Sequence, residues 1–384
     1  MEEEDQALFI QEPQHRPSVS TMEAQGIPVI DLSPVTSSNP SISSIDALVK
    51  EIGSVCKEWG FFQVTNHGVP LSLRQNLLEA SKNFFSQSLQ EKKKVSRDES
   101  SPSGYYDTEL TRNVRDWKEV FDFLAKEPTF FPVIADELDD RVTQLSNKSP
   151  QHPSHFRDII QEYIEEMEKL AFKLMELIAM SLGLQPKRLE EFFMRGQTSL
   201  IRLNYYPPCP FPHIALGVGP HKDESALTIL AQDEVEGLEV KHKTHQEWVR
   251  VKPTPNDYII NVGDIIQINL VLNVRCKADR AHIPSNGDRA YNPSNGNRAR
   301  IPSNGINAQQ RDSVWISYRT CRVWLYNRQM SSLTKKSIME LLSLYAKFGR
   351  GSSEGVVTDF DVLFFSSSIK KFFQSFYRSD FVQR

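Results

Sequence analysis

The tripeptide His221-Lys222-Asp223 places an imidazole and a carboxylate two residues apart. On an extended backbone, residues i and i+2 point to the same face, so both side chains could converge on one ion from a single strand. With a distant second histidine they would form a 2-His-1-carboxylate triad, which leaves coordination positions open for a co-substrate and dioxygen. An ordinary surface His–Asp pair would have the same letters, so the neighbouring sequence must decide between the two.

Several short blocks surround this tripeptide in a definite order. The blocks near it are Asn204-Tyr205-Tyr206-Pro207-Pro208-Cys209-Pro210, Ala226–Asp233, Gly237–Val240 and Asn261–Asp264. The blocks nearer the N-terminus are Ile27–Ser33, Trp59–Gly68 and Phe84-Phe85. In order and spacing, residues 1–267 resemble the plant-type Fe(II)- and 2-oxoglutarate-dependent dioxygenases, the family that includes flavonol synthase and anthocyanidin synthase.

The resemblance implies a set of site residues and cofactors. His221 and Asp223 would be iron ligands, and Asn204 and Tyr206 would line the 2-oxoglutarate site, although strand packing would account for Tyr206 equally well. His67, in an Asn-His-Gly turn, would be structural rather than a ligand. The implied cofactors are Fe(II), 2-oxoglutarate as co-substrate and ascorbate in support. The implied reaction uses dioxygen to hydroxylate or desaturate a small organic metabolite.

The chain departs from the family pattern after Gln267. The second iron histidine, expected in a His-Arg-Val setting, would fall near Lys277, where no histidine occurs. His282 follows five positions late, and we do not expect it to bind iron. Arg311-Asp312-Ser313 has the letters of the Arg-x-Ser that holds the far carboxylate of 2-oxoglutarate, but it lies 90 residues beyond His221. The sequence therefore predicts that the third ligand and the co-substrate arginine are missing.

Hydrophobic periodicity predicts helices first and strands afterwards. The expected helices begin at Ser43, run from 72 to 94, and extend over Phe156–Leu182, where apolar residues recur at helical spacing. The expected strands are Ile27–Leu32, Phe61–Val64, Ser199–Tyr206, Ala226–Ala231, Leu238–Lys241, Trp248–Val251 and Tyr258–Asn261. This order predicts an α+β chain, with an N-terminal helical region followed by a jelly-roll (double-stranded β-helix) core.

The region after Gln267 contains three Pro-Ser-Asn-Gly units, centred on Pro284, Pro293 and Pro302. These units favour turns and offer no apolar face to bury. We therefore expect the jelly roll to be incomplete at its C-terminal end and residues 276–310 to be poorly ordered. The predicted divisions are a mobile arm over 1–25, an N-terminal dioxygenase domain over 26–150, a partial catalytic core over 151–267 and an atypical tail over 268–384.

Composition limits the possible settings of the protein. Residues 268–384 contain 18 Lys+Arg and 8 Asp+Glu, a net charge of +10, whereas the whole chain is −4 and residues 1–267 are therefore −14. The basic part has no ordered motif, so nucleic acid is not an expected partner. No apolar run is long enough for a membrane span. The acidic start and four scattered cysteines indicate a reduced cytoplasmic setting, and we expect a monomer.

Two alternatives to an active dioxygenase follow from the residues. The first is a non-enzymatic variant, because the chain as written lacks the second iron histidine and the 2-oxoglutarate arginine at their expected places. The second is an iron enzyme that uses another co-substrate, as aminocyclopropane-carboxylate oxidase does, but it would still need the second histidine. The identity of the substrate is not encoded in any readable motif.

Overall fold

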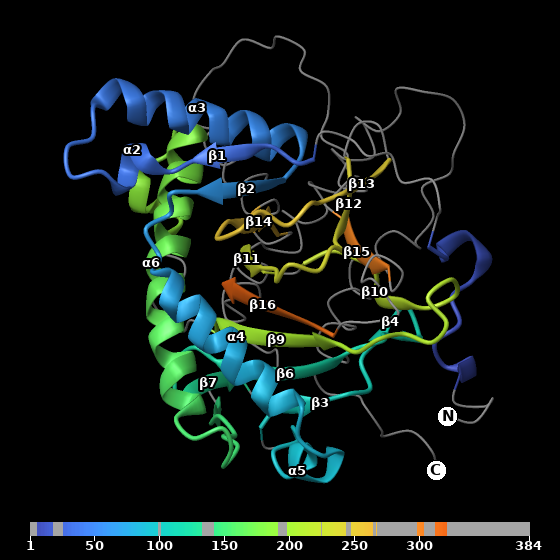
Figure 1. Cartoon of the computed structure of the whole chain (residues 1–384). Coiled ribbons are helices and arrows are strands. Elements are labelled where there is room, and N and C mark those ends of the chain that lie inside the picture. Colours follow the sequence, from blue (N-terminus) through green and yellow to red (C-terminus); the bar gives the residue numbers. More distant parts are fainter. Residues whose placement is uncertain are drawn as a thin grey trace, which may run out of the picture.

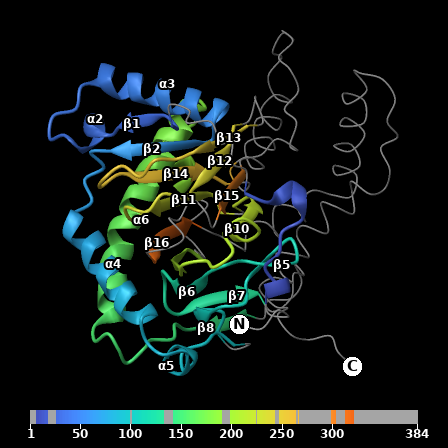
Figure 2. The same cartoon turned by 45° about the vertical axis from the view of Figure 1, so that its right-hand side comes forward.

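A computed structural model describes residues 6–17, 26–98, 101–132, 142–190, 198–223, 225–242, 247–263, 266, 298–302 and 312–320. Its helices are η1 (Pro13–His15), α2 (Ser33–Thr36), α3 (Ile42–Glu58), α4 (Leu71–Phe85), α5 (Leu89–Lys93), α6 (Phe156–Ser181) and η2 (Pro186–Arg188). Helices α3, α4 and α6 gather on one side of the strands, as both views show (Figure 1, Figure 2). The expected order of helices and strands is thus confirmed in outline.

Local capping explains where the helices begin and end. Helix α3 begins at Ile42, one residue before the expected Ser43, because the Ser41 side chain accepts a hydrogen bond from the Ser44 N–H at 3.1 Å. The helix predicted over 72–94 is divided in two, since Ser88 caps a new short helix at the Glu91 N–H. Helix α6 matches its predicted range closely, because its apolar stripe is buried along its whole length.

Eight strands form the larger sheet, in the order β1-β2-β14-β11-β16-β9-β6-β3. Their bounds are β1 Val29–Asp31, β2 Phe61–Thr65, β14 Tyr258–Val262, β11 Leu227–Ala231, β16 Ser313–Thr320, β9 Leu200–Tyr206, β6 Glu119–Leu124 and β3 Gly104–Tyr106. The smaller sheet has the order β10-β15-β12-β13, formed by Leu216–His221, Arg298–Pro302, Glu239–Lys241 and Trp248–Arg250. Two small hairpins complete the described strands: β4 (Leu110–Thr111) with β5 (Val114–Arg115), and β7 (Thr129–Pro132) with β8 (Val142–Leu145).

The prediction that the jelly roll stops at Gln267 is wrong. Strand β16 lies between β11 and β9, antiparallel to both, and β15 pairs with β10 and β12 (Figure 1). The physical reason is that pairing in a sheet depends on register between strands and not on their separation along the chain. Of the segment 276–310 that we expected to be poorly ordered, 298–302 form β15, and the rest lies outside the described residues.

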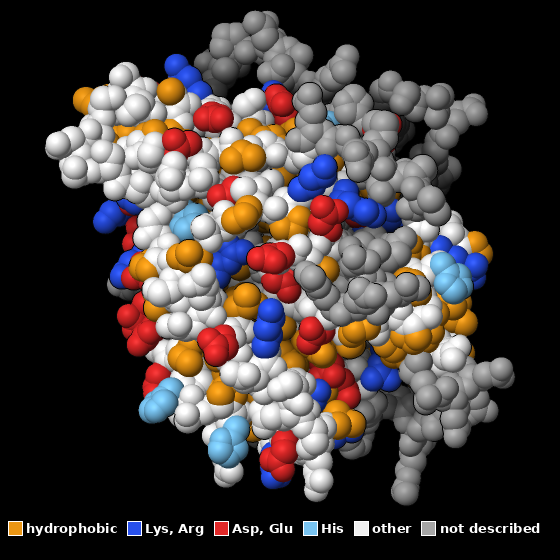
Figure 3. Space-filling view, viewed as in Figure 1, with side chains coloured by type: hydrophobic (Ala, Val, Ile, Leu, Met, Phe, Trp, Pro, Cys, Tyr) orange, Lys and Arg blue, Asp and Glu red, His pale blue; other side chains and the backbone are white. Residues whose placement is uncertain are grey.

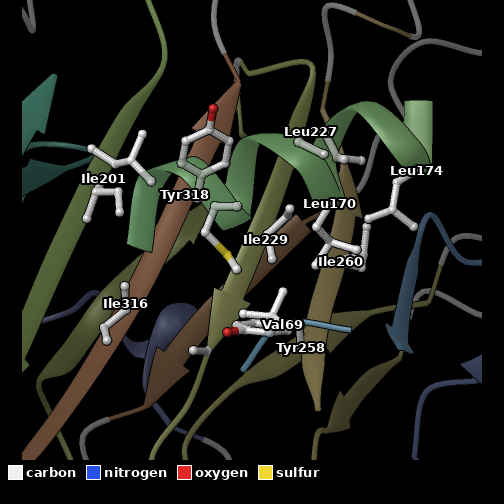
Figure 4. Packing of buried hydrophobic residues seen from close by; sticks show 14 of the residues in the cluster. Val69, Leu170, Leu174, Ile201, Leu227, Ile229, Tyr258, Ile260, Ile316 and Tyr318 are labelled. Carbon is white, nitrogen blue, oxygen red and sulfur yellow. The ribbon is translucent and has the colours of Figure 1, made fainter. Parts of the chain in front are cut away.

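Two apolar clusters hold the layers together. The larger lies between the helices and the eight-stranded sheet, where Leu170 and Leu174 of α6 face strand residues such as Ile229, Ile260 and Tyr318 (Figure 4). The smaller lies between the two sheets and includes Trp315 of β16. Since side chains alternate along a strand, central strands such as β14 and β16 supply one face to each cluster.

The arm predicted to be mobile is packed over its described part, residues 6–17. Phe9 is buried against Trp117 and Phe211, with ring centroids 4.8 and 6.2 Å away. Two backbone hydrogen bonds, Gln11 N–H to Ile214 O and Arg115 N–H to Leu8 O, each 2.9 Å long, fix the segment. Phe9 lies in a short apolar run whose members Leu8 and Ile10 are exposed, so the run has no periodicity by which the sequence could reveal this contact.

Acidic, basic and apolar side chains are interspersed on the face shown in Figure 3. The acidic excess of residues 1–267 is therefore not gathered into one patch on that face. Among the described residues, no helix combines the length and the apolar character needed to cross a membrane.

Candidate metal and co-substrate site

His221 is the last residue of β10, and its ring is held in one orientation. Its Nδ1 lies 2.9 Å from the Gly219 carbonyl oxygen, so Nδ1–H donates there and Nε2 keeps its lone pair. Burial lowers the pKa of His221, an effect that Asp223 and the Gly219 hydrogen bond oppose in part. The neutral ring with a free Nε2 is the form that binds metal ions.

Asp223 lies two residues beyond His221, just past the end of β10, and is oriented by two neighbours. Its Oδ2 accepts hydrogen bonds from Thr228 Oγ1 at 2.7 Å and Asn261 Nδ2 at 3.0 Å. Burial raises the pKa of Asp223, but Arg319, His221 and these hydrogen bonds outweigh burial and lower it below its ordinary value. The carboxylate is therefore ionised over the whole physiological range.

The two side chains converge, as we expected from their i, i+2 spacing. His221 Nε2 and Asp223 Oδ1 are 3.6 Å apart, and Oδ1 is buried without a hydrogen-bond partner. Ligand atoms about 2.1 Å from an ion and at right angles are about 3 Å apart, so this spacing suits a small divalent cation. Oδ1 accepts no hydrogen bond, although the Arg319 Nη2 atom lies 3.4 Å from it, and a cation between Oδ1 and the Nε2 lone pair would satisfy both atoms. The two residues fit a metal ion.

A third protein ligand is not found in the described part of the chain. No group of three His, Cys, Asp or Glu side chains converges there. The strand beside His221 is β15, which places Ala299 across from it. Both Lys277, where the second histidine was expected, and His282 lie outside the described residues.

Asn204 and Tyr206 lie on the same face of β9, directed toward the space between the sheets. Tyr206 is buried against Trp315, with ring centroids 5.2 Å apart, and burial raises the pKa of its hydroxyl. Ser313, the first residue of β16, pairs across the ladder with Tyr206. Trp315 Nε1 is buried nearby without a hydrogen-bond partner among the described atoms. This region therefore offers polar groups with unused hydrogen-bonding capacity.

The position of Ser313 in the sheet differs from what its distance from His221 along the chain suggests. We discounted Arg311-Asp312-Ser313 because it lies 90 residues beyond His221. The structure nevertheless places Ser313 beside Tyr206, because the additional residues fall in the connections around β15 and leave the position of β16 in the sheet unchanged. Arg311 itself lies outside the described residues.

A buried network of charges adjoins the site. Arg202 binds Asp122 through two hydrogen bonds of 2.8 Å and Glu109 through one of 2.7 Å. Lys118 lies 2.5 Å from Glu109 and 3.4 Å from Asp116, whose pKa burial raises to about 6. The network reaches the metal site because Asp116 Oδ1 accepts the Gly219 N–H at 3.0 Å. It thereby fixes the backbone that orients the His221 ring.

Gly263 brings the loop after β14 against the residues that follow Asp223. A Cβ atom at this position would lie 1.8 Å from Ser225 O and 3.0 Å from Asp223 O, so no side chain fits. We expect Gly263→Ala to push the 223–225 backbone away, lower the stability by about 2 kcal/mol or more and weaken metal binding. Thermal unfolding and Mn(II) titration would measure both effects. An unchanged melting temperature would contradict the close approach.

Sequence reasoning missed the groups that support the two predicted ligands. Thr228 and Asn261 lie inside blocks that we used only for the resemblance, and their polar side chains at otherwise apolar strand positions were the available signal. Arg319 and Asp116 gave no such signal. His67 is fixed as expected of a structural residue: Nδ1 accepts the Val69 N–H at 3.0 Å and Nε2–H donates to Asn256 O at 2.7 Å.

Known proteins with similar sequences share this arrangement of the chain. Residues 27–153 match the family of the non-haem dioxygenase in morphine synthesis N-terminal domain, and residues 197–305 match the 2OG-Fe(II) oxygenase superfamily. Codeine O-demethylase of Papaver somniferum is 34% identical over 267 residues, which cover 67% of this chain and 67% of that protein. Gibberellin 20 oxidase 1 of Arabidopsis thaliana is 36% identical over 259 residues, which cover 67% of this chain and 65% of that protein. The chain thus spans about two thirds of the length of these relatives.

Solved structures agree with the sequence comparison. The crystal structure of JOX2 in complex with 2OG, Fe and JA superposes with a TM-score of 0.61 at 27% identity, covering 82% of this chain and 79% of JOX2. The rice dioxygenase for auxin oxidation, at 23% identity and a TM-score of 0.54, covers 77% of this chain and 84% of its own and shares the fold. The match to the 2OG-Fe(II) oxygenase superfamily extends to residue 305 and so includes β15, beyond the point where we expected the core to end. The chain belongs to the 2OG-Fe(II) oxygenase superfamily.

Proposed function

We propose that this protein uses Fe(II), 2-oxoglutarate and dioxygen to oxidise a small organic metabolite, by hydroxylation or desaturation. The observation that supports this most directly is the convergence of His221 Nε2 and Asp223 Oδ1 at 3.6 Å, with no hydrogen bond to Oδ1, within a jelly roll of this superfamily. The relatives are named for reactions on codeine and gibberellin. The comparisons give no support to the non-enzymatic alternative.

Each proposed site residue has a distinct task. His221 and Asp223 would hold the metal, with the Gly219 carbonyl selecting the tautomer of His221. Asn204 and Tyr206 would line the 2-oxoglutarate site, and Ser313 pairs with Tyr206 across the ladder. Iron, when bound, supplies open coordination positions and the redox chemistry for dioxygen activation. Ascorbate would support activity by keeping the metal reduced.

The setting of the protein is part of the same proposal. Cysteines without a paired spacing support a reducing, cytoplasmic compartment. We propose that the protein acts as a monomer on a small molecule, because the metal ligands and the proposed co-substrate residues all come from one chain.

The test measures succinate release by the full chain with Fe(II), 2-oxoglutarate and ascorbate, without added substrate. Since removing a supporting residue already weakens a metal site roughly 10–100-fold, we expect Asp223→Asn, which removes a ligand charge, to lower succinate release at least about 100-fold. The nearly isosteric Lys222→Gln, between the two ligands, serves as the matched control and should retain activity. If the unchanged protein released succinate no faster than Asp223→Asn does, the proposed function would be refuted.

A further inference from the structure

Arg319 places a permanent positive charge at the metal site. Its Nη2 lies 3.4 Å from Asp223 Oδ1, the same oxygen that faces His221 Nε2. The Arg319 side chain is 26% exposed, and its Nε is buried without a hydrogen-bond partner among the described atoms. The guanidinium therefore neutralises the carboxylate from one side, while its Nε–H donates no hydrogen bond among the described atoms.

The fold requires Arg319 to be there. Along β16 the side chains of Ile316 and Tyr318 join the cluster under the helices, whereas Trp315 joins the cluster between the sheets. Since alternate residues share a face, Arg319 points to the same side as Trp315. The ladder pairs Arg319 with Thr228, the residue that donates to Asp223 Oδ2. Arg319 and Thr228 thus approach the two oxygens of one carboxylate.

A metal ion and a guanidinium compete for the same charge. Arginine stays protonated at every physiological pH, so it cannot neutralise itself when a cation arrives. A metal ion bound between His221 and Asp223 would lie close to this positive group in a partly desolvated setting, where charge repulsion is larger than in water. To bind, the metal ion must displace Arg319 from Asp223 and must also lose part of its own hydration shell.

We propose that Arg319 is an internal competitor for Asp223, which stabilises the metal-free site and lowers its affinity for a divalent cation. This inference rests on the proposed metal site. The two proposals differ because the metal site concerns the ligands His221 and Asp223, whereas this inference gives Arg319, which is not a ligand, control over the affinity for the metal.

The experiment titrates the full chain with Mn(II), which binds oxygen and nitrogen ligands as Fe(II) does and does not turn over. We expect Arg319→Gln to bind Mn(II) about tenfold more tightly than the unchanged protein. Arg319→Lys, which keeps the charge, should stay within about threefold of the unchanged protein, well short of that tenfold step. Arg319→Met keeps the apolar stem of the side chain and provides a second neutral variant if Arg319→Gln folds poorly.

A second readout separates competition from a structural role. Without metal, the neutral variants should unfold at a lower temperature than the unchanged protein, because the ion pair with Asp223 is lost. Added Mn(II) should then raise their melting temperature by more than it raises that of the unchanged protein. A residue that only supported the fold would lower stability and leave the Mn(II) affinity equal or weaker, and that result would overturn the inference. If the unchanged protein and the neutral variants all failed to bind Mn(II), the proposed metal site would fail with it.

Discussion

A chain that ends at Gln267 should fail to fold cooperatively. It would lack β15 and β16, and β16 contributes four large, almost fully buried side chains, Val314, Trp315, Ile316 and Tyr318. At about 1.5–3 kcal/mol for each buried apolar side chain, their loss removes roughly 6–12 kcal/mol. That is about the whole stability of a typical domain, which is roughly 5–15 kcal/mol. The shortened chain would also expose β11 and β9 as open edges, which favours aggregation.

The measurement is the urea unfolding transition of the shortened chain beside that of the full protein. We expect the full protein to unfold in one steep transition and the shortened chain to show none. The substitution Ile316→Asp in the full chain tests the same strand with little change in length, and should also abolish the transition. A steep transition in the chain that ends at Gln267 would mean that β16 is dispensable to the sheet.

Arg202→Met should destabilise the protein by about 3–5 kcal/mol, the cost of removing one partner from a buried ion pair. Arg202 is 10% exposed and serves two carboxylates, Asp122 and Glu109. Burial opposes the charged form of Arg202, but the two carboxylates outweigh it and raise its pKa well above the ordinary value. Without the guanidinium, Asp122 remains buried with its charge uncompensated, whereas Glu109 still has Lys118. Urea denaturation would give the loss in free energy of unfolding.

The matched control for this prediction is the double variant Arg202→Met/Asp122→Leu. Removing both partners leaves no uncompensated charge at Asp122, so the double variant should recover a large part of the stability lost by Arg202→Met. If the stability lost by the double variant equalled the sum of the losses of Arg202→Met and Asp122→Leu measured singly, the two residues would not depend on each other, contrary to their two 2.8 Å hydrogen bonds.

The parts of the fold that sequence predicted are those set by local pattern. Helix α6 was predicted almost to the residue because it buries one continuous stripe, and β9, β11 and β14 were predicted from short apolar runs between turns. Strand β10 gave no such pattern, since its Gly-Val-Gly-Pro stretch is buried without alternation. The convergence of the two ligands followed from their spacing, because it depends on one short segment alone.

The parts that sequence missed depend on pairing between distant segments. We dismissed Ser313 by counting residues from His221, although the count measures the length of connections and not the position of a strand in a sheet. Arg319 lies beside Asp223 only because the register with Thr228 brings it there, and nothing near it in sequence indicates that register. A buried charge network such as that of Arg202 likewise draws its members from separate strands.

The place of β16 in the sheet also determines when this protein can fold during its synthesis. The strands on either side of it, β11 and β9, leave the ribosome long before residue 320, and until β16 follows the sheet cannot be completed between them. Strand β2, made early, pairs with β14, and β14 reaches β16 only through β11, so early and late parts of the described chain belong to one sheet. Domains that need such distant pairings fold slowly and expose apolar edges while they wait. We therefore expect the nascent chain to stay open to protease, and to depend on chaperones, until β16 is available to join its two neighbours.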